Sequence, residues 1–209
     1  MTSMDDPSFG QAMTGDAEHV VLLDESWNAV GSIPKVRAHH RSTPLHLAFT
    51  AYVFDEAGRL LLTRRALSKR TWPGVWTNSL CGHPAPGESL VDAVRRRLRA
   101  ELGTTAERIE PVLGAVRYRA TMGNGIVENE VGPAVRVLQA APLAPNPDEV
   151  DRVRWAPWEA VLAEVDHQRL ELSPWSAITI ERLRRLGPHP REWPVVGVRD
   201  LPPPLRCRD

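Results

Sequence analysis

Cysteine is scarce in this chain of 209 residues, which contains only Cys81 and Cys207. A single pair of cysteines cannot form the network of disulfides that holds many small secreted proteins together. We therefore expect the protein to work in a reducing, cytoplasmic compartment. The scarcity also draws attention to Cys81, which lies in the loop-rich stretch KRTWPGVWTNSLCGHPAPG, two residues before His83.

An excess of charge of either sign is also absent, because 26 basic residues balance 26 acidic residues. A net charge near zero provides no global attraction for nucleic acids or anionic membranes, so any anion must be bound by a local cluster. No apolar run reaches the roughly 18 residues that a membrane-spanning helix requires. The N-terminal stretch MTSMDDPSFGQAMTGDAEHV is acidic and lacks the basic start and apolar segment of a secretory signal. We expect no nucleic-acid partner and no membrane span.

The length suits one domain of ordinary size. Residues 1–18 are small, polar and acidic, and we expect them to form a disordered tail. Residues 19–186 contain the regular patterns and form the predicted domain. Six prolines lie between Pro188 and Pro204, so residues 187–209 are predicted to form an irregular arm or a disordered tail.

Strand-like patterns dominate the predicted domain. We expect two short strands within residues 19–36 and a hairpin over 46–65, around the turn sequence Asp55-Glu56-Ala57-Gly58. Two further strands are expected over 109–121 and 125–140. Strands mixed with few helices predict an α/β or α+β fold rather than a helical bundle.

The sequence pattern predicts one long helix and two shorter helices. Residues 88–103 are predicted to form the clear helix, because apolar residues recur at helical spacing at Val91, Val94, Leu98 and Leu102. Gly103 can end this helix. The shorter helices are expected over 157–165 and 173–186.

Histidines and glutamates form a candidate metal site. Glu128 and Glu130 in the sequence ENE lie two residues apart, and in a strand two such side chains share one face. Imidazole and carboxylate ligands together suit Zn²⁺, Mn²⁺ or Fe²⁺ better than Ca²⁺. The histidines that could join them are His39, His46 and His83. From the residues alone, His40 could replace His39, and all of these histidines could be ordinary surface or hydrogen-bonded residues.

Basic residues form a candidate anion site. Arginine can bind a diphosphate through two donors, and lysine adds a compact charge. The alternative is a solvated basic surface that pairs with nearby carboxylates. The cationic clusters contain Lys35, Arg64, Arg65, Lys69, Arg70 and the three residues Arg95, Arg96 and Arg97.

The Cys81 thiol has two possible roles. A lone cysteine is commonly a small buried apolar residue, and it becomes reactive only where its surroundings favour the required protonation state. Its position in a Gly- and Pro-containing loop beside His83 favours a chemical role.

The stretch GHPAPGESLVDAVRRRLRAELG resembles the Nudix box, in which a glycine and a glutamate precede an Arg-Glu-rich helix whose glutamates bind the Mg²⁺ ions of diphosphate hydrolases. The matching residues are Gly82, Glu88, Arg96, Leu98, Glu101 and Gly103. Arg97 and Ala100 stand where hydrolases have metal-binding glutamates. This departure argues against ordinary Nudix hydrolysis.

A second resemblance accounts for the altered box. The runs LHLAFTAYVFDEAGRLLLTRRALSKRTWPGVWTNSLCGHPAPGES, RYRAT, GIVENEV and SPW resemble the type I isopentenyl-diphosphate Δ-isomerases over about Lys35 to Trp175. The resemblance does not reach the first 18 or so residues or the Pro-rich end. It implies a Nudix-type mixed β-sheet sandwiched by helices. It also implies an isomerase of isoprenoid biosynthesis that interconverts isopentenyl diphosphate and dimethylallyl diphosphate.

The resemblance assigns roles to individual residues. Cys81 and Glu130, the latter assisted by Tyr118, would be the acid and base groups on opposite faces of the substrate. Glu101 and the main-chain carbonyl of Cys81 would hold Mg²⁺ that arrives with the diphosphate. One Zn²⁺ or Mn²⁺ would be bound by His39, His46, His83, Glu128 and Glu130. The substrate would be bound by Lys35, Arg65, Lys69, Arg97 and Trp175.

Two other functions remain as alternatives to the isomerase. A Nudix hydrolase of an unusual substrate would share the fold, and a non-catalytic metal- or partner-binding module would need no reactive groups. The presence of Cys81, Glu130 and Tyr118 together argues against the module. We expect a small diphosphate as the substrate and a monomer or weak oligomer as the assembly.

Overall fold

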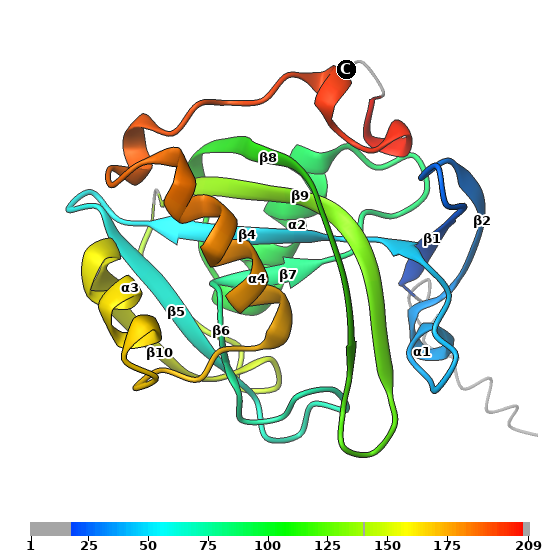
Figure 1. Cartoon of the computed structure of the whole chain (residues 1–209), viewed down its shortest axis with the longest axis horizontal. Helices are drawn as coiled ribbons and strands as arrows, with labels where there is room; N and C mark the ends of the chain where they lie inside the picture. The colour runs from blue at the N-terminus through cyan, green and yellow to red at the C-terminus, as the bar shows by residue number, and fades with distance from the viewer. Residues whose placement is uncertain (1–17, 140, 207–209) are drawn as a thin grey trace, which may run out of the picture.

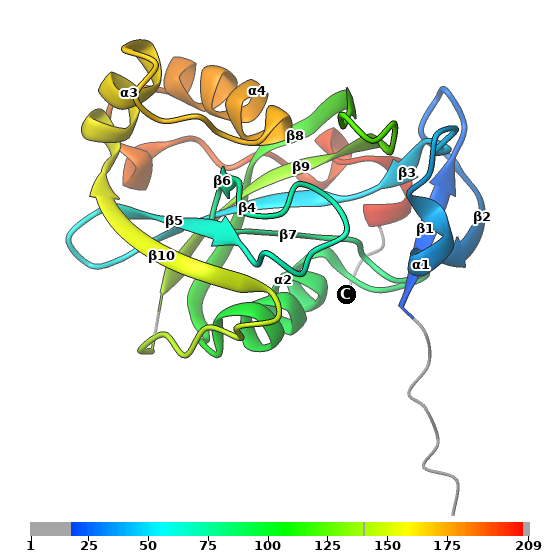
Figure 2. The same ribbon diagram turned by 90° about the horizontal axis from the view of Figure 1, so that it is seen from below.

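The computed structural model of the chain describes residues 18–139 and 141–206. All but Glu18 of the predicted N-terminal tail, and Cys207 with the last two residues, lie outside this part. A mixed β-sheet forms the middle layer, with α2 on one face and α3 and α4 on the other (Figure 1; Figure 2). These layers agree with the predicted fold class.

The bounds of the strands and helices follow. The strands are β1 (His19–Leu23), β2 (Ala29–Pro34), β3 (His46–Leu47), β4 (Phe49–Phe54), β5 (Arg59–Arg65), β6 (Trp76–Thr77), β7 (Leu80–Gly82), β8 (Ala106–Thr121), β9 (Val127–Gln139) and β10 (Val150–Pro157). The helices are α1 (Lys35–Ala38), α2 (Leu90–Arg97), α3 (Trp158–Asp166) and α4 (Pro174–Leu183). A π-helical turn, Leu98–Leu102, extends α2.

The sheet is mixed because β9 runs parallel to two of its neighbours. The strand order is β10-β5-β4-β9-β3-β1-β2, with β6 beside β5, β7 beside β4 and β8 beside β9. β9 pairs in parallel with β3 and β4, and antiparallel with β8. The parallel register places His46 opposite Glu130. The sheet thus brings together residues that lie far apart in the sequence.

Strand β4 separates two hydrophobic clusters, and all six of its residues are buried. Phe49, Ala51 and Val53 pack into the cluster that contains apolar residues of α2. Tyr52 and Phe54 point to the opposite face, into the cluster that contains residues of α3 and α4. Alternate side chains of a strand face opposite sides of a sheet, so one central strand supports both helical layers.

The predicted helix over 88–103 is confirmed as α2 with its π-helical turn. Ser89 caps its start by accepting a hydrogen bond from the Asp92 amide at 3.1 Å. Gly103 ends it with a φ of 57°, a left-handed conformation that glycine adopts without strain. The shorter predicted helices also form, as α3 and α4.

The predicted hairpin differs from the observed strands. β4 and β5 are joined by the expected turn, but they pair only at Phe54 and Leu60. Away from the turn, β6 pairs with β5 and β7 pairs with β4, so these short strands fill the space between the two arms. β10 then pairs along the length of β5. The first arm of the predicted hairpin is divided into β3 and β4, and the sequence pattern did not predict β10 or the short helix α1.

Residues 187–206 form an irregular arm that packs across the domain. The buried side chain of Trp193 joins the cluster on the α3 and α4 side, whereas Leu201 and Leu205 join the other cluster. The buried Arg136 guanidinium donates hydrogen bonds to the carbonyls of Pro190 (2.7 Å) and Trp193 (3.1 Å). The arm therefore belongs to the packed structure over these residues.

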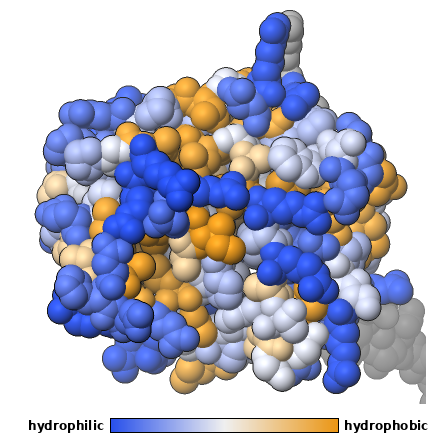
Figure 3. All heavy atoms as spheres, in the orientation of Figure 1, coloured by the Kyte–Doolittle hydropathy of each residue, from blue (hydrophilic) through white to orange (hydrophobic). Residues whose placement is uncertain are grey.

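The outer surface shows scattered apolar side chains. On the face that carries α4, hydrophilic and hydrophobic residues are interspersed (Figure 3). Large exposed apolar residues such as Val30, Val153 and Ile178 come from separate elements. Within residues 18–139 and 141–206, no helix is long and apolar enough to cross a membrane.

Candidate functional site

A cavity of about 360 Å³ contains the predicted site. Its wall comes from α1, from the loop after β5, from β7 and its following loop, from α2 with its π-helical turn, and from β8, β9 and α4. Every residue assigned to the site by resemblance lines this cavity except His46, which is fully buried behind it. These lining residues are Lys35, His39, Arg65, Lys69, Cys81, His83, Arg97, Glu101, Tyr118, Glu128, Glu130 and Trp175.

Four of the predicted metal ligands converge at one side of the cavity. One ligand atom from each of His39, His46, His83 and Glu130 lies within 4.8 Å of the others. They come from the end of α1, from β3, from the residue after β7, and from β9. The cluster is a candidate site for a divalent metal ion. His40, the alternative to His39, instead accepts a hydrogen bond from the Ser42 amide at its Nδ1.

In this cluster the Nε2 atoms of the three histidines point toward one carboxylate oxygen, Glu130 Oε1. His46 Nδ1 lies 2.9 Å from the Pro44 carbonyl, which can only accept, so Nδ1 carries the proton. The lone pair of its Nε2 is then free for a metal. Glu130 Oε1 lies 3.2 Å from His46 Nε2 and 3.0 Å from His83 Nε2. This donor arrangement fits a divalent ion.

Glu128 contributes a second carboxylate beside the cluster. Its Oε2 lies 2.8 Å from His39 Nε2. Burial lowers the pKa of His39, but Glu128 and Glu130 outweigh this effect and raise it to about 9. In contrast, burial lowers the pKa of His83 to about 4. The two carboxylates thus favour a positive charge at the place where the histidines meet, as expected of a cation site.

Tyr118 and Glu130 form the polar floor of the cavity. The Tyr118 hydroxyl donates a hydrogen bond to Glu130 Oε2. Burial, and then the charge of Glu130, raise the pKa of Tyr118 well above its ordinary value. Burial acts to raise the pKa of Glu130, but the three imidazoles outweigh it and hold this pKa well below its ordinary value. The phenol therefore keeps its proton beside an ionised carboxylate.

Cys81 lines the cavity from β7. Its sulfur contacts the side-chain amide of Asn78 twice. Asn78 Nδ2 lies 3.4 Å from Sγ as a donor, and Asn78 Oδ1 lies 3.5 Å from Sγ as an acceptor. The same Nδ2 donates to the Leu80 carbonyl at 2.7 Å and to the Ala51 carbonyl at 3.1 Å, which fixes the amide in place. Burial raises the pKa of the Cys81 thiol to about 12. The thiol is therefore protonated at neutral pH and held at a defined position.

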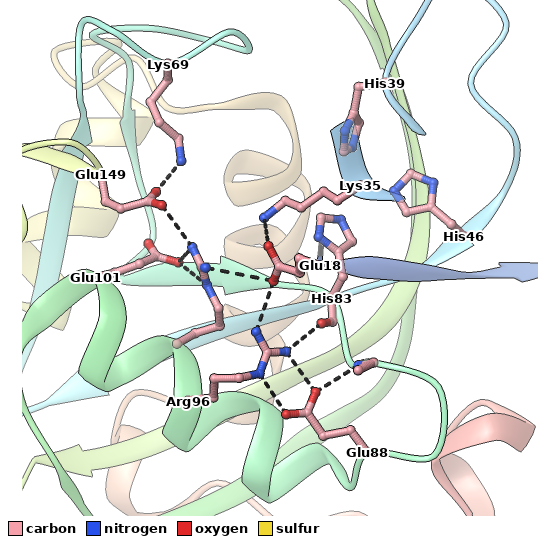
Figure 4. A network of polar contacts seen from close by, with 12 residues as sticks. Glu18, Lys35, His39, His46, Lys69, His83, Glu88, Arg96, Glu101 and Glu149 are labelled. Carbon is pink, nitrogen blue, oxygen red and sulfur yellow. Dashed lines mark hydrogen bonds and ion pairs between the residues drawn. The ribbon is translucent and has the colours of Figure 1, made fainter. Parts of the chain in front are cut away.

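Three cations of the cavity, Lys35, Lys69 and Arg97, are paired with carboxylates in this structure (Figure 4). Glu149 joins Lys69 and Arg97, with an oxygen 3.4 Å from an Arg97 nitrogen. Glu18 lies 2.7 Å from the ammonium of Lys35. These basic residues line the cavity, as expected of an anion site. They also pair with nearby carboxylates, as expected of the alternative, a basic surface.

The altered Nudix helix contributes to this network. Arg97 Nη2 lies 2.6 Å from an oxygen of Glu101, one turn further along. Burial alone would lower the pKa of Arg97, but Glu101, Glu18 and Glu149 outweigh it and raise this pKa. Its neighbour Arg96 does not line the cavity, but it binds Glu88 at 2.8 Å and Glu18 at 3.0 Å, so it ties the loop before α2 to the same network.

Trp175 closes the cavity from the start of α4. The guanidinium carbon of Arg65 lies 5.5 Å from the centroid of the Trp175 ring, within the range of a cation–π contact. Tyr118 and Trp72 flank the indole, with ring centroids at 6.0 Å and 5.2 Å. This wall is aromatic and already accommodates a positive charge.

Sequence reasoning missed several residues that act on the site. Glu18 and Glu149 pair with its cations, and Asn78 holds Cys81. Asn78 stands three residues before Cys81 and could have been suspected from that distance. The partners of the two glutamates lie 17 and 80 residues away, so no local pattern points to them.

Comparisons with known proteins place the chain in a family. The Nudix domain family profile matches residues 44–176. A curated relative from Saccharopolyspora erythraea, named isopentenyl-diphosphate Delta-isomerase, is 50% identical over 185 residues, covering 88% of this chain and 95% of the relative. A relative of the same name from Citrobacter koseri is 49% identical over 166 residues, covering 79% of this chain and 91% of the relative.

A solved structure supports the fold. The crystal structure of a Deinococcus radiodurans protein matches with a TM-score of 0.62 at 20% identity, covering 79% of this chain and 98% of that one. At this identity the likeness concerns the fold alone. The identity and coverage of the curated relatives, together with the family profile, lead to a firmer conclusion. The chain belongs to the Nudix domain family and, within it, to the isopentenyl-diphosphate Delta-isomerases.

Proposed function

We propose that this protein interconverts isopentenyl diphosphate and dimethylallyl diphosphate in isoprenoid biosynthesis. The observation that carries the proposal is the presence, in one cavity, of a positioned thiol and a tyrosine–carboxylate pair beside a cluster of cations. The reaction moves a double bond by one position, so it needs one group that adds a proton and another that removes one.

The proton must be added to an unactivated alkene, which is a very weak base. The acid must therefore be oriented, and the site must exclude water because a tertiary carbocation would form. Glu130 and Tyr118 share a hydrogen bond in a buried place, and we assign one of the two proton transfers to this pair. Cys81, on β7 and held by Asn78, makes the other proton transfer, at the opposite side of the substrate. Because the two diphosphates interconvert, each group is the acid in one direction and the base in the other.

The proposed metal site acts on Glu130, one of the two proton-transfer groups. His39, His46, His83, Glu128 and Glu130 would hold Zn²⁺ or Mn²⁺, which suit imidazole and carboxylate ligands. When bound, the ion supplies positive charge that makes a carboxyl group beside it a stronger acid. The chain's own contribution is to fix the imidazole tautomers, as the Pro44 carbonyl does for His46.

The diphosphate serves as an anchor and is not cleaved. Lys35, Arg65, Lys69 and Arg97 would bind it, with Mg²⁺ held by Glu101 and the Cys81 carbonyl. Glu18 pairs with Lys35 in the present structure, and Glu149 pairs with Lys69 and Arg97. The incoming diphosphate would replace these carboxylates as the partner of the three cations. Binding energy from this remote group positions the alkene between the two proton-handling sides.

The aromatic wall would stabilise the carbocation. A cation over an aromatic ring gains about 0.5–2 kcal/mol, depending on how well water is excluded. Trp175 is only 3% exposed, and the Arg65 contact demonstrates that its face can accept a cation. We place the reaction in the cytoplasm, with a small diphosphate as the substrate.

Nudix hydrolysis is less well supported. Arg97 and Ala100 replace two carboxylates of the hydrolase box, and Glu101 is engaged by Arg97. A cation at position 97 suits a diphosphate that must survive. A non-catalytic module would need neither the fixed Cys81 thiol nor the Tyr118–Glu130 pair, so nothing specific favours it.

The test measures conversion of isopentenyl diphosphate and release of phosphate by the wild type, Cys81→Ala and Cys207→Ala. We expect isomerisation without phosphate release in the wild type and in Cys207→Ala, which removes the other thiol. Cys81→Ala should still bind the diphosphate but lose isomerisation. Phosphate release would favour the hydrolase, and full activity of Cys81→Ala would remove the thiol from the reaction.

A further inference from the structure

The thiol and the indole that face the substrate belong to different layers of the fold, and this inference rests on the proposed function. Cys81 lies on β7 in the sheet, whereas Trp175 lies at the start of α4, in the helical layer that covers one face of the sheet (Figure 2). A misplacement of about 1 Å between groups that act together can cost roughly 10²-fold in rate. The contacts that set the separation of thiol and indole therefore matter for the reaction.

Asn78 holds the thiol end of this separation. Its Nδ2 donates to the carbonyls of Leu80 and Ala51, which can only accept, so the nitrogen of the amide must face these two groups. Its Oδ1 then faces the other way, where it accepts a hydrogen bond from the Thr77 hydroxyl at 2.9 Å and lies 3.5 Å from Cys81 Sγ. One oxygen atom thus joins the thiol to Thr77.

Thr77 continues the path to the helical layer. Its Oγ1 lies 2.7 Å from the Oγ of Ser173. A hydroxyl has one proton, and Thr77 donates its own to Asn78, so Ser173 is the donor in this bond. The backbone follows the same route, because the Ser173 amide donates to the Trp76 carbonyl at 2.8 Å. Hydrogen bonds therefore run without interruption from Cys81 to the residue that precedes α4.

The Ser173 hydroxyl is not used in the way that is usual for its position. Ser173 is the N-cap of α4, where a serine oxygen commonly accepts a hydrogen bond from an amide two or three residues further on. Within the described part of the chain this cap bond is not formed, and the hydroxyl bonds to Thr77 instead. Pro174 follows with a restricted φ, and Trp175 lies in the same first turn. Holding Ser173 in place therefore also sets the direction in which the indole leaves the helix.

The three side chains of this path are buried. Thr77 is 3% exposed, and Asn78 and Ser173 are 0% exposed. Buried polar groups cost free energy unless they are hydrogen-bonded, and each polar side-chain atom of these three residues has a partner. A buried polar network in which every member is satisfied is rigid and favours one arrangement of the groups that it joins. Such a network between two layers is suited to holding a distance.

We propose that the hydrogen-bonded link Ser173–Thr77–Asn78 sets the distance between the Cys81 thiol and the Trp175 indole for catalysis. Its members lie behind the cavity wall and act through Cys81 and Trp175, so they are positioning residues. The link holds the thiol at the carbon that exchanges a proton while the indole faces the carbon that becomes positive. The diphosphate is anchored by other groups, so a broken link should reduce the rate and leave binding almost unchanged.

The experiment compares variants of the link with the wild type. Thr77→Val keeps the shape of threonine but removes the hydroxyl, Thr77→Ser keeps the hydroxyl, and Ser173→Ala removes the other hydroxyl. A double variant combines Thr77→Val with Ser173→Ala. Thr104→Val is the matched control, because Thr104 is a buried threonine outside the site whose hydroxyl donates to the Ala141 carbonyl at 2.7 Å. For each protein, kcat and KM are measured with isopentenyl diphosphate, and the Tm is measured by thermal unfolding.

A broken link has a distinct kinetic signature. Thr77→Val and Ser173→Ala should each lower kcat roughly tenfold with little change in KM. The double variant should also lose roughly tenfold, not roughly a hundredfold, because both changes interrupt the same link. Thr77→Ser should restore kcat. Thr104→Val should lower the Tm about as much as Thr77→Val and keep the wild-type kcat.

Other outcomes would overturn the proposal. A loss of roughly a hundredfold in the double variant would mean that the two hydroxyls act separately. An equal loss of kcat in Thr104→Val would mean that any buried hydroxyl matters through stability alone, and wild-type kcat in Thr77→Val would mean that the link is not needed. If the double variant does not fold, the comparison of Thr77→Val, Thr77→Ser and Thr104→Val decides. Failure of the proposed function would look different, because the wild type itself would then not isomerise the substrate.

Discussion

Tyr118 and Glu130 stand directly opposite each other on β8 and β9, and the tyrosine hydroxyl donates a hydrogen bond to the carboxylate. Both side chains are more than nine-tenths buried. The antiparallel pairing of two long strands sets their separation, so the pair does not depend on a mobile loop. The other oxygen of Glu130 faces three histidines, which places proton transfer and the candidate metal site on one carboxylate.

Replacing Tyr118 with phenylalanine tests this pair. The change removes one hydroxyl and keeps the ring, so the fold should remain intact. Because the phenol acts in proton transfer, we expect kcat to fall by roughly 10²-fold with little change in KM. Steady-state kinetics with isopentenyl diphosphate measures both. A rise in KM with an unchanged kcat would mean that Tyr118 only contributes to binding.

The adjacent histidines allow a matched test of the metal site. His39→Gln should lower the metal content per chain, and His40→Gln should leave it unchanged, because only His39 belongs to the cluster. Elemental analysis of the purified proteins measures the content. A strong chelator should abolish wild-type activity, and Zn²⁺ or Mn²⁺ should restore it. Equal metal content in both variants would contradict the assignment.

Trp175 tests whether the cavity wall stabilises positive charge. Trp175→Phe keeps an aromatic face and should keep most activity, whereas Trp175→Leu should lose turnover by roughly tenfold, or about 1.4 kcal/mol. The loss should appear in kcat more than in substrate affinity, because the carbocation exists only during the reaction. Equal turnover of the two variants would mean that the indole only shapes the cavity and does not stabilise the carbocation.

Glu18 gives a prediction for the dependence of stability on pH. Burial tends to raise its pKa, but Lys35, Arg97 and Arg96 outweigh this effect and lower the pKa from 4.5 to about 2. A carboxylate with a depressed pKa stabilises the fold above its unfolded pKa and loses this contribution as the pH falls. Glu18→Gln should therefore lower the Tm at pH 7, and the difference from wild type should shrink between pH 4.5 and 2. Thermal unfolding in a pH series measures it, and a difference that stays constant would argue against the ion pairs.

The C-terminal arm should contribute to stability. Trp193 is 2% exposed and packs against Phe54 and Trp158, with ring centroids at 5.8 Å and 5.2 Å. Trp193→Ala should reduce the free energy of unfolding by about 3–5 kcal/mol, as for other large aromatic residues removed from a core. Denaturant unfolding measures the loss. The matched change Val195→Ala, at a half-exposed position of the same arm, should cost little; equal losses would mean that the arm is not anchored through Trp193.

The sequence by itself determined the types of residue at the site and much of the local structure. The spacing of Glu128 and Glu130 places both on one face of a strand, and the cavity contains both. The apolar spacing of residues 88–103 and Gly103 determined a helix and its end, because helix periodicity and a left-handed glycine depend on neighbours in the chain. The motifs around Cys81 determined the family resemblance.

Only the tertiary structure decided which distant residues meet. His39 rather than its neighbour His40 joins the metal cluster, because the chain leaves α1 in a direction that turns one ring inward. The pairing of β10 with β5 brings Glu149 beside Lys69, and the register of β4 with β7 brings Thr50 beside Cys81. Such contacts join residues tens of positions apart, and periodicity reports only on close neighbours. The ion pairs and the buried hydroxyls around the site therefore exist only once the sheet has closed.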